Sequence, residues 1–185
     1  MADAKISIEQ IKKLKELSGV GLTDAKQALV EAKGDFDKAL EAMRKKGLTK
    51  AEKRGDRETR EGLVDAYVHD GRIAAIVELN CETSFVAKTD EFKTLAHQIA
   101  MQVASMNPLY VTESDIPEDV RAAKMKDQIL AGQAKKAFAD KVLMNQPYIL
   151  DDSKTVEAFI KESIAKTGEN ITVRQFKRIE LGVTE

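Results

Sequence analysis

Residues 62–81 read GLVDAYVHDGRIAAIVELNC, and this stretch decides the predicted architecture. Side chains alternate with a period of two before and after Asp70-Gly71, which is the periodicity of a β-strand. Asp-Gly is a strong signal for a two-residue hairpin, because a type I′ turn needs positive φ at both central residues. The stretch therefore predicts two antiparallel strands. One face of the second strand would carry Ile73, Ala75, Val77 and Leu79.

The chain after the hairpin predicts helices that pack on the sheet. A long helix ends at Asn107-Pro108, because the residue before a proline avoids the helical conformation. A second helical stretch opens at Asp115-Ile116-Pro117, with proline at a favourable first position, and continues to about Met144 with an interruption at Gly132. The apolar stripe of the long helix consists of Phe92, Leu95, Ala96, Ile99, Val103 and Met106.

The last part of the chain predicts an extended piece, a helix and a third strand. Pro147 favours the extended piece, and Asp152-Ser153 is expected to cap a helix that Gly168 ends. A strand should then run from 171 to about 181. Its alternation slips between 173 and 176, which indicates a β-bulge.

The first 47 residues predict three short amphipathic helices that bury one another as a bundle. Ser7 and Gln10 form a capping box, and the glycines at 19–21 end the first helix. Thr23 is expected to cap the second helix. The third should end before Gly47, after basic residues that complement its dipole. The expected apolar positions are Ile8, Ile11, Leu14, Leu17, Ala25, Ala28, Leu29, Ala32, Phe36, Ala39, Leu40 and Met43.

The pattern predicts an α+β protein in three parts: a helical bundle at 1–47, a charged linker at 48–61, and a core domain at 62–185. The core would hold a three-stranded antiparallel sheet packed with helices. The stretch from Arg44 to Glu61 is rich in basic residues and is predicted to be polar and partly helical. An RNA contact between Arg44 and Arg60 is the functional alternative, although no aromatic side chain is interleaved for base stacking.

Composition limits the classes of function. The 185 residues carry 30 basic and 31 acidic side chains, so the chain has no overall attraction for nucleic acids or anionic membranes. No apolar run approaches the length of a membrane span or of a signal peptide. Cys81 is the only cysteine, so a disulfide framework within the chain is impossible. A cytoplasmic protein is expected.

The chain contains little that predicts chemistry. His69 and His97 lie on different predicted elements, without ligands at zinc-site spacing, so no metal or cofactor is expected. Cys81 could act as a nucleophile with a distant histidine, but a lone cysteine at a strand end is typical of a small buried residue. The chain is therefore expected not to be an enzyme.

Residues 80–88, NCETSFVAK, lead from the second strand into the long helix and offer two N-caps, Thr83 and Thr89. If the long helix starts at Ser84, Phe85 lies seven residues before Phe92 on the same buried stripe. If it starts at Thr89, Phe85 lies on a protruding turn, where a partner's pocket could receive the ring. Spacing alone favours the buried interpretation.

The segment NCETSFVAK resembles the signature of the translation elongation factor Ts (EF-Ts) family, which carries Thr-Asp-Phe within Asn-Cys-Glu-Thr-Asp-Phe-Val-Ala. LKELSGVGLTDAKQAL at 14–29 and GDFDKALEAMRKKG at 34–47 are similar to the family's N-terminal motifs. Further matches are IAMQVASMNPLYV at 99–111, NQPYI at 145–149 and GENITVRQFKRIELG at 168–182. The resemblance covers nearly the whole chain in order.

The resemblance implies a ubiquitin-associated (UBA-like) N-terminal bundle and one core domain, as in the short form of the family, for which homodimers are expected. It also implies a partner, elongation factor Tu (EF-Tu) carrying GDP. The chain would act as a guanine-nucleotide exchange factor in bacterial-type protein biosynthesis. The alternative is an RNA- or protein-binding module without exchange activity, such as a ubiquitin-binding bundle.

The resemblance also implies which residues contact EF-Tu. The turn of Thr83, Ser84, Phe85 and Val86 would insert the Phe85 ring between helices of the partner's nucleotide domain and disturb the magnesium and phosphate contacts, so that GDP leaves. Ser84 stands where the family has Asp and is alternatively a helix cap. Gln102 stands where many members have His, and the stretch from 121 to 132 is shorter than usual. A second contact to the same domain is implied for Leu22, Thr23 and Asp24.

Overall fold

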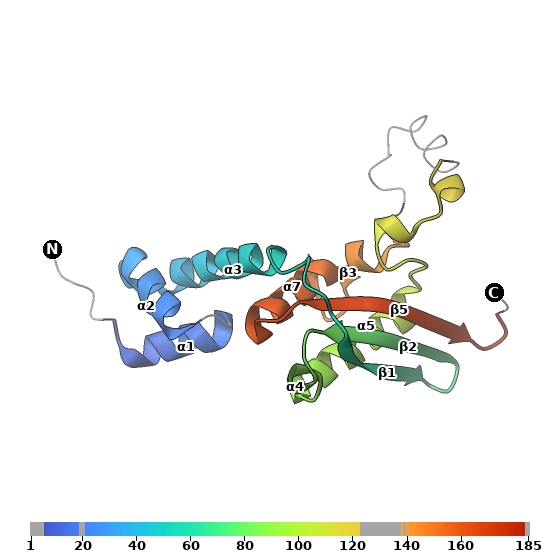
Figure 1. The fold of residues 1–185 in the computed structure, drawn as a ribbon, viewed down its shortest axis with the longest axis horizontal. Coiled ribbons are helices and arrows are strands. Elements are labelled where there is room, and N and C mark those ends of the chain that lie inside the picture. Colours follow the sequence, from blue (N-terminus) through green and yellow to red (C-terminus); the bar gives the residue numbers. More distant parts are fainter. Residues whose placement is uncertain (1–5, 19–20, 123–137, 139, 184–185) are drawn as a thin grey trace. The chain divides into compact units, whose positions relative to one another are not determined.

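The computed structural model describes residues 6–18, 21–122, 138 and 140–183 (Figure 1). The described residues form two compact units. One consists of residues up to 58 together with 160–171, and the other of 59–159 together with residues from 172 onward. The α+β class is confirmed, whereas the three-part division at 47/48 and 61/62 stays a prediction. None of the described helices is long and apolar enough to cross a membrane.

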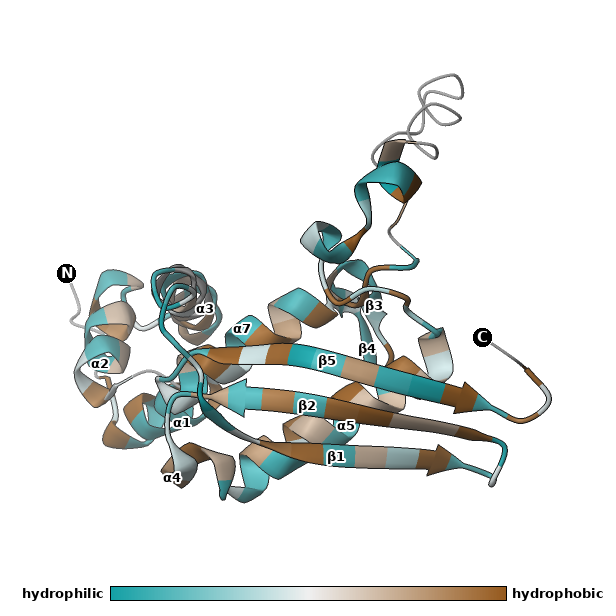
Figure 2. Cartoon of the chain, turned by 45° about the vertical axis from the view of Figure 1, so that its right-hand side comes forward, coloured by the Kyte–Doolittle hydropathy of each residue, from teal (hydrophilic) through white to brown (hydrophobic). Residues whose placement is uncertain are grey.

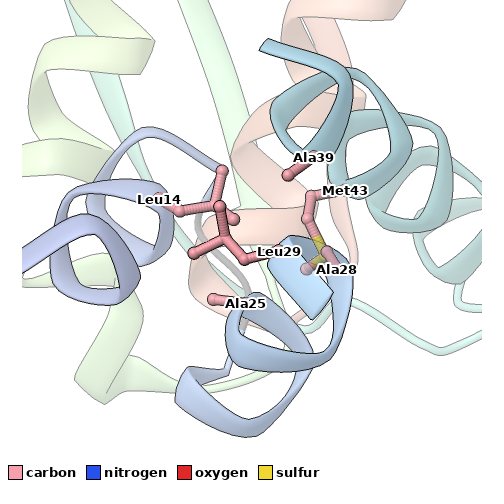
Figure 3. Close-up of a cluster of buried hydrophobic side chains, with 6 residues drawn as sticks. All are labelled: Leu14, Ala25, Ala28, Leu29, Ala39 and Met43. Atoms are coloured by element: carbon pink, nitrogen blue, oxygen red, sulfur yellow. The ribbon is translucent and has the colours of Figure 1, made fainter. Parts of the chain in front are cut away.

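Helices α1 (Ile8–Ser18), α2 (Leu22–Glu31) and α3 (Phe36–Glu52) pack around a small apolar core. The predicted capping box starts α1: the Ser7 N–H donates to the Gln10 side chain, and the Gln10 N–H donates to the Ser7 hydroxyl. The other expected apolar positions are buried in this core or pack against it, but Ile8 and Leu17 are 72% and 47% exposed, so their assignment to the buried face is wrong. The buried side chains of the bundle, drawn in Figure 3, are Leu14, Ala25, Ala28, Leu29, Ala39 and Met43.

Helix α2 begins before the predicted cap. Its N-cap is Gly21, whose carbonyl accepts the first helical hydrogen bond from the Ala25 N–H at 3.0 Å. Thr23 therefore lies inside the first turn, and the prediction of Thr23 as N-cap is wrong. Glycine is an acceptable N-cap, although it offers no side-chain hydrogen bond to the helix.

Helix α3 continues through Gly47, where the sequence pattern predicted its end. Gly47 is buried, and a Cβ at this position would lie 3.2 Å from the Ala165 Cβ of α7 (Val156–Thr167). The absence of a side chain thus allows α3 to approach closely the part of α7 that belongs to the same unit, from residue 160 onward. Packing outweighs the low helix propensity of glycine here.

Part of the predicted charged linker is bound to its own unit. The Arg54 guanidinium donates to the Ile164 carbonyl at 3.3 Å. The buried Asn170 amide donates to the carbonyls of Gly55 and Arg57 at 3.1 and 2.7 Å. These bonds hold the end of the stretch against the segment that leads out of α7.

The predicted antiparallel hairpin is confirmed, but His69 pairs with Ile73, so three residues (70–72) connect the strands instead of the predicted two. Strands β1 (Glu61–His69) and β2 (Ile73–Cys81) pair antiparallel in a register that places Glu61 opposite Cys81. Asp70 and Gly71 have φ of 48° and 66°, as a type I′ turn requires.

The three-stranded sheet has the order β1-β2-β5, with β5 spanning Ile171–Glu180. Helix α5 (Asp90–Met106) packs along β1 and β2, and Figure 2 shows it on one face of the sheet. Its apolar stripe meets the predicted inner face of β2, where Ala75, Val77 and Leu79 are buried. The sequence pattern therefore predicted the buried face of β2 and most of the buried face of α5 correctly, but Met106 at the end of the stripe is 39% exposed and its assignment to the buried face is wrong.

The stretch between α5 and α7 differs from its prediction. A 3-10 helix, η1 (Glu113–Asp115), precedes a short helical run at 118–122, and the predicted continuation falls largely outside the described residues. Its predicted end is wrong, because Val142 forms a β-bridge with Tyr110 and η3 (Leu143–Asn145) follows as a 3-10 helix.

The predicted cap of the next helix is also wrong. Asp152 and Ser153 lie in strand β4 (Asp151–Thr155), which pairs with β3 (Pro147–Tyr148). Helix α7 starts three residues later, where the Thr155 hydroxyl accepts the Ala158 N–H at 3.2 Å. Asp151 and Thr155 pair with Tyr148 and Pro147, and the two predicted caps lie in the strand between these paired positions.

Candidate functional site: the α4 turn

The one-turn helix α4 (Ser84–Ala87) joins β2 to α5 and carries an exposed aromatic ring. Phe85 is 79% exposed, whereas its neighbours Val86 and Ala87 are each only 8% exposed. The turn therefore has an inner side that is packed against the protein and an outer tip formed by Phe85. The interpretation of Phe85 as a core residue, which spacing favoured, is wrong.

Two threonines cause this arrangement. The Thr83 hydroxyl accepts the Val86 N–H at 3.4 Å and caps α4, while the Thr89 hydroxyl accepts the Phe92 N–H at 3.2 Å and caps α5. Two helices with separate caps replace the single helix that would have placed both phenylalanines on one stripe. The chain turns at Lys88 and Thr89, so the helical phase of Phe85 is independent of that of Phe92.

The segment before α4 is tightly packed. Cys81 is fully buried at the end of β2, and its thiol donates to the Thr83 carbonyl at 3.2 Å. Across the hairpin, a Cβ on Gly62 would lie 2.2 Å from the Leu79 carbonyl oxygen and 2.8 Å from the Asn80 Cα. Gly62 thus allows β1 to approach β2 closely just before the turn. The prediction of Cys81 as a buried small residue is confirmed.

Ser84 is the exposed first residue of α4, and Thr83 is the residue that caps this helix. The alternative assignment of Ser84 as the cap is therefore wrong. Ser84 presents a neutral hydroxyl group next to the Phe85 ring. At the tip, an apolar ring is flanked by the uncharged side chains of Thr83 and Ser84, which suits contact with a protein surface.

The four residues predicted around the turn are contiguous on one element, but the second predicted group belongs to the other unit. Leu22, Thr23 and Asp24 form the first turn of α2. Leu22 is 50% exposed and Thr23 is exposed, whereas the Asp24 carboxylate lies 2.8 Å from the Lys46 ammonium group. Leu22 and Thr23 are therefore accessible, and Asp24 has a partner within its own bundle.

Sequence reasoning missed a contact between β1 and α5. The His97 Nδ1 atom lies 3.1 Å from an Asp65 carboxylate oxygen, and the His97 ring meets the Tyr67 ring edge-on at 5.7 Å between centroids. The alternation along β1 could have predicted this contact, because it places Asp65 and Tyr67 on the half-buried face of the strand, which faces α5. Within the described ranges, no group of three His, Cys, Asp or Glu side chains is arranged to hold a metal ion.

Gln102 was noticed in the sequence only as a departure from the family. It is fully buried in α5, where its side-chain amide donates to the Gln146 side chain and the Pro147 carbonyl at 3.2 and 3.1 Å. Its side-chain oxygen accepts the Ile149 N–H at 2.8 Å. Gln102 therefore connects α5 to β3 and lies in the protein interior.

Comparison with known proteins gives a consistent result. The family model described as elongation factor TS matches residues 6–183. Elongation factor Ts of Thermotoga maritima is 49% identical over 193 aligned residues, which cover 96% of this chain and 97% of the relative. The proteins of the same name from Moorella thermoacetica and Fervidobacterium nodosum are 45% and 43% identical, and each alignment covers 96% of this chain and 96% and 99% of the relative.

Proposed function

The chain belongs to the elongation factor Ts family, and from that premise we propose that it binds EF-Tu carrying GDP and promotes the release of GDP during translation elongation. The factor makes and breaks no covalent bond in this process. It acts by binding, so its effect is limited to the difference between its affinities for the GDP-bound and nucleotide-free states of EF-Tu. By linkage, the factor weakens GDP binding by the same ratio as GDP weakens binding of the factor.

The single observation that carries the proposed mechanism is the exposed Phe85 ring on a capped and anchored turn. Burying a phenylalanine side chain in a partner contributes roughly 1.5–3 kcal/mol. Because Thr83 and Thr89 hold the turn before the partner arrives, little further ordering opposes that gain. Phe85 is thus the group that would enter the nucleotide domain of EF-Tu and disturb its magnesium and phosphate contacts.

The other residues of the turn have different roles in this proposal. Thr83 and Ser84 are exposed and flank the ring, so they would contact the same surface of EF-Tu. Val86 is buried and would support the ring from within. Ser84 brings no charge to the magnesium site, so in this chain the ring acts without a neighbouring carboxylate.

A secondary contact is proposed for the start of α2. Leu22 and Thr23 are accessible and can reach a partner, whereas Asp24 would contribute mainly by holding Lys46. A contact of this kind adds affinity without acting on the nucleotide. We also propose that the factor forms a homodimer, which analytical ultracentrifugation across a range of concentrations would test.

The function is tested by following the release of a fluorescent GDP analogue from EF-Tu in the presence of excess unlabelled GDP. We expect the native chain to accelerate release and Phe85→Ala to abolish most of the acceleration. Leu150→Ala is a matched control, because Leu150 is also an exposed large apolar residue of the same unit, at the β3–β4 turn. This control should release GDP at the native rate.

Two outcomes would contradict the proposal in different ways. If the native chain does not accelerate release from a cognate EF-Tu, the exchange function is wrong. If Phe85→Ala remains folded and accelerates release as the native chain does, exchange stands and the role of Phe85 is wrong. Circular dichroism of each variant establishes that the compared proteins are folded.

A further inference from the structure

The hydroxyl group of Thr89 connects the two helices on either side of it. It donates to the Val86 carbonyl of α4 at 2.8 Å and accepts the Phe92 N–H of α5 at 3.2 Å. The backbone N–H of Thr89 also donates to the Val86 carbonyl, at 3.0 Å. One side chain thus serves a carbonyl at the end of one helix and an N–H at the start of the next, two groups that lack partners within their own helices.

This connection has mechanical importance because α4 consists of a single turn. A helix of four residues has almost no stability of its own, so its orientation depends on the contacts that hold it. Val86, whose carbonyl receives the Thr89 bonds, is adjacent to Phe85, and Phe92, whose N–H completes the link, is buried in the core. A short path of bonded groups therefore runs from the rigid helix α5 to the exposed ring.

We propose that Thr89 is a positioning residue for nucleotide exchange: its hydroxyl fixes the orientation of α4 relative to α5 and so holds the Phe85 ring ready for EF-Tu. The proposal rests on the proposed function of Phe85. Without the hydroxyl, the Thr89 N–H still bonds to the Val86 carbonyl, so the turn persists but its orientation is less restricted.

Three substitutions separate the two bonds of the hydroxyl. Thr89→Ser keeps both the donor and the acceptor. Thr89→Asp keeps an acceptor that caps α5 but removes the donor to Val86, because an ionised carboxylate only accepts hydrogen bonds. Thr89→Val keeps the branched shape, carries no charge and removes both bonds. Thr155→Asp and Thr155→Val are matched controls, because Thr155 lies in the same unit as Thr89 and caps α7.

The experiment measures the acceleration of GDP release from EF-Tu, the unfolding midpoint in urea and the exchange of the Val86 and Ala87 amide protons in the free protein. For Thr89→Asp we expect release to slow about five- to tenfold, as the loss of one hydrogen bond allows, with a midpoint close to the native value. Amide exchange in α4 should rise. Thr89→Val should slow GDP release at least as much, whereas Thr89→Ser should retain the native rate of release.

Each alternative has its own result. If Thr89→Asp accelerates GDP release as the native chain does, Thr89 has no positioning role. The same conclusion follows if the Thr155 variants lose as much of the acceleration as the Thr89 variants. If GDP release is slow with Thr89→Asp but as fast as native with Thr89→Val, the effect comes from the added charge, and the positioning role is again wrong. If the native chain itself does not accelerate release, the exchange function fails, and amide exchange in the free protein still reports whether the hydroxyl holds α4.

Discussion

Phe85 and Phe92 are seven residues apart, a spacing that would place them on one face of a continuous helix, yet they have opposite environments. Phe85 is 79% exposed on α4, and Phe92 is 1% exposed at the start of α5. Both follow a threonine cap, Thr83 or Thr89. The difference arises at Lys88 and Thr89, where one helix ends and the next begins with a new phase.

The comparison shows that apolar spacing predicts burial only within one uninterrupted helix. Where a cap intervenes, each helix takes its own orientation, and an apolar residue can be directed to solvent. The exposure of such a residue disagrees with what its sequence pattern predicts, and disagreements of this kind are expected at functional sites. The exposure of Phe85, which follows from the new helix start at Thr89, therefore indicates that Phe85 has a role other than packing.

The largest expected effect is on the buried side of this comparison. Phe92→Ala removes a fully packed ring from the layer between α5 and the sheet and should lower the free energy of unfolding by about 3–5 kcal/mol. Urea denaturation followed by circular dichroism measures the loss. A loss below about 1 kcal/mol would mean that Phe92 is not a core residue.

A smaller loss of stability is expected beneath the turn. Gly62→Ala would place a Cβ 2.2 Å from the Leu79 carbonyl oxygen, so β1 must move away from β2 next to Cys81. Overpacking of this kind costs typically 1–3 kcal/mol. The comparable change Gly71→Ala meets no atom within 4 Å, although its φ of 66° adds local strain. If Gly62→Ala unfolds at the same urea concentration as the native chain, the two strands do not approach each other as closely as described.

On the exposed side, Phe85→Ala should change the free energy of unfolding by no more than about 0.5 kcal/mol, as is usual for surface substitutions. The contrast with Phe92→Ala is measured in the same urea titrations. A loss near that of Phe92→Ala would mean that the two rings belong to one core after all. The interpretation of α4 as an outward-facing turn would then be withdrawn.

The smallest expected effect is on stability at another helix cap, Asp35. It tests whether a capping side chain also stabilises the start of a helix elsewhere in the chain. Asp35 precedes α3 and accepts the Lys38 N–H at 3.1 Å. The hydrogen bond from the Lys38 ammonium group, followed by the one from its backbone, holds the pKa of Asp35 below its ordinary value of 3.8. A lowered folded-state pKa stabilises the protein above the unfolded value, and this contribution is lost as pH falls through the folded value.

Asp35→Asn keeps a capping oxygen but removes the charge, so its unfolding midpoint should fall less than that of the native chain as pH drops below about 4. Near pH 7, where Asp35 is charged, the variant should be slightly less stable than the native chain. Thermal unfolding across the acid range measures both. Parallel curves for the two proteins would show that this carboxylate does not contribute.

Local rules predicted much of the fold. Asp70-Gly71 identified the hairpin turn, and Ser7 with Gln10 identified the start of α1, because in each case the residues that determine the geometry are neighbours in sequence. The inner face of β2 and the stripe of α5 followed from periodicity. These are features for which propensity, pattern and packing agree.

The errors arose where distant packing decided the outcome. Gly47 does not end α3, because Ala165, far away in sequence, packs against it. Asp152 and Ser153 do not cap a helix, because they lie in a strand whose two end residues, Asp151 and Thr155, pair with β3. The orientation of Phe85 depends on which of two threonines starts α5, and spacing favoured the start that the structure does not show.

The central claim is that EF-Tu contacts Phe85 and leaves Phe92 untouched. Fluorine NMR tests it directly on the full chain with 4-fluorophenylalanine at its six phenylalanine positions, the signals being assigned by single Phe→Leu variants. On adding nucleotide-free EF-Tu, we expect the Phe85 signal to shift or broaden strongly while the Phe92 signal keeps its position. An unchanged Phe85 signal in a sample that binds EF-Tu would contradict the account.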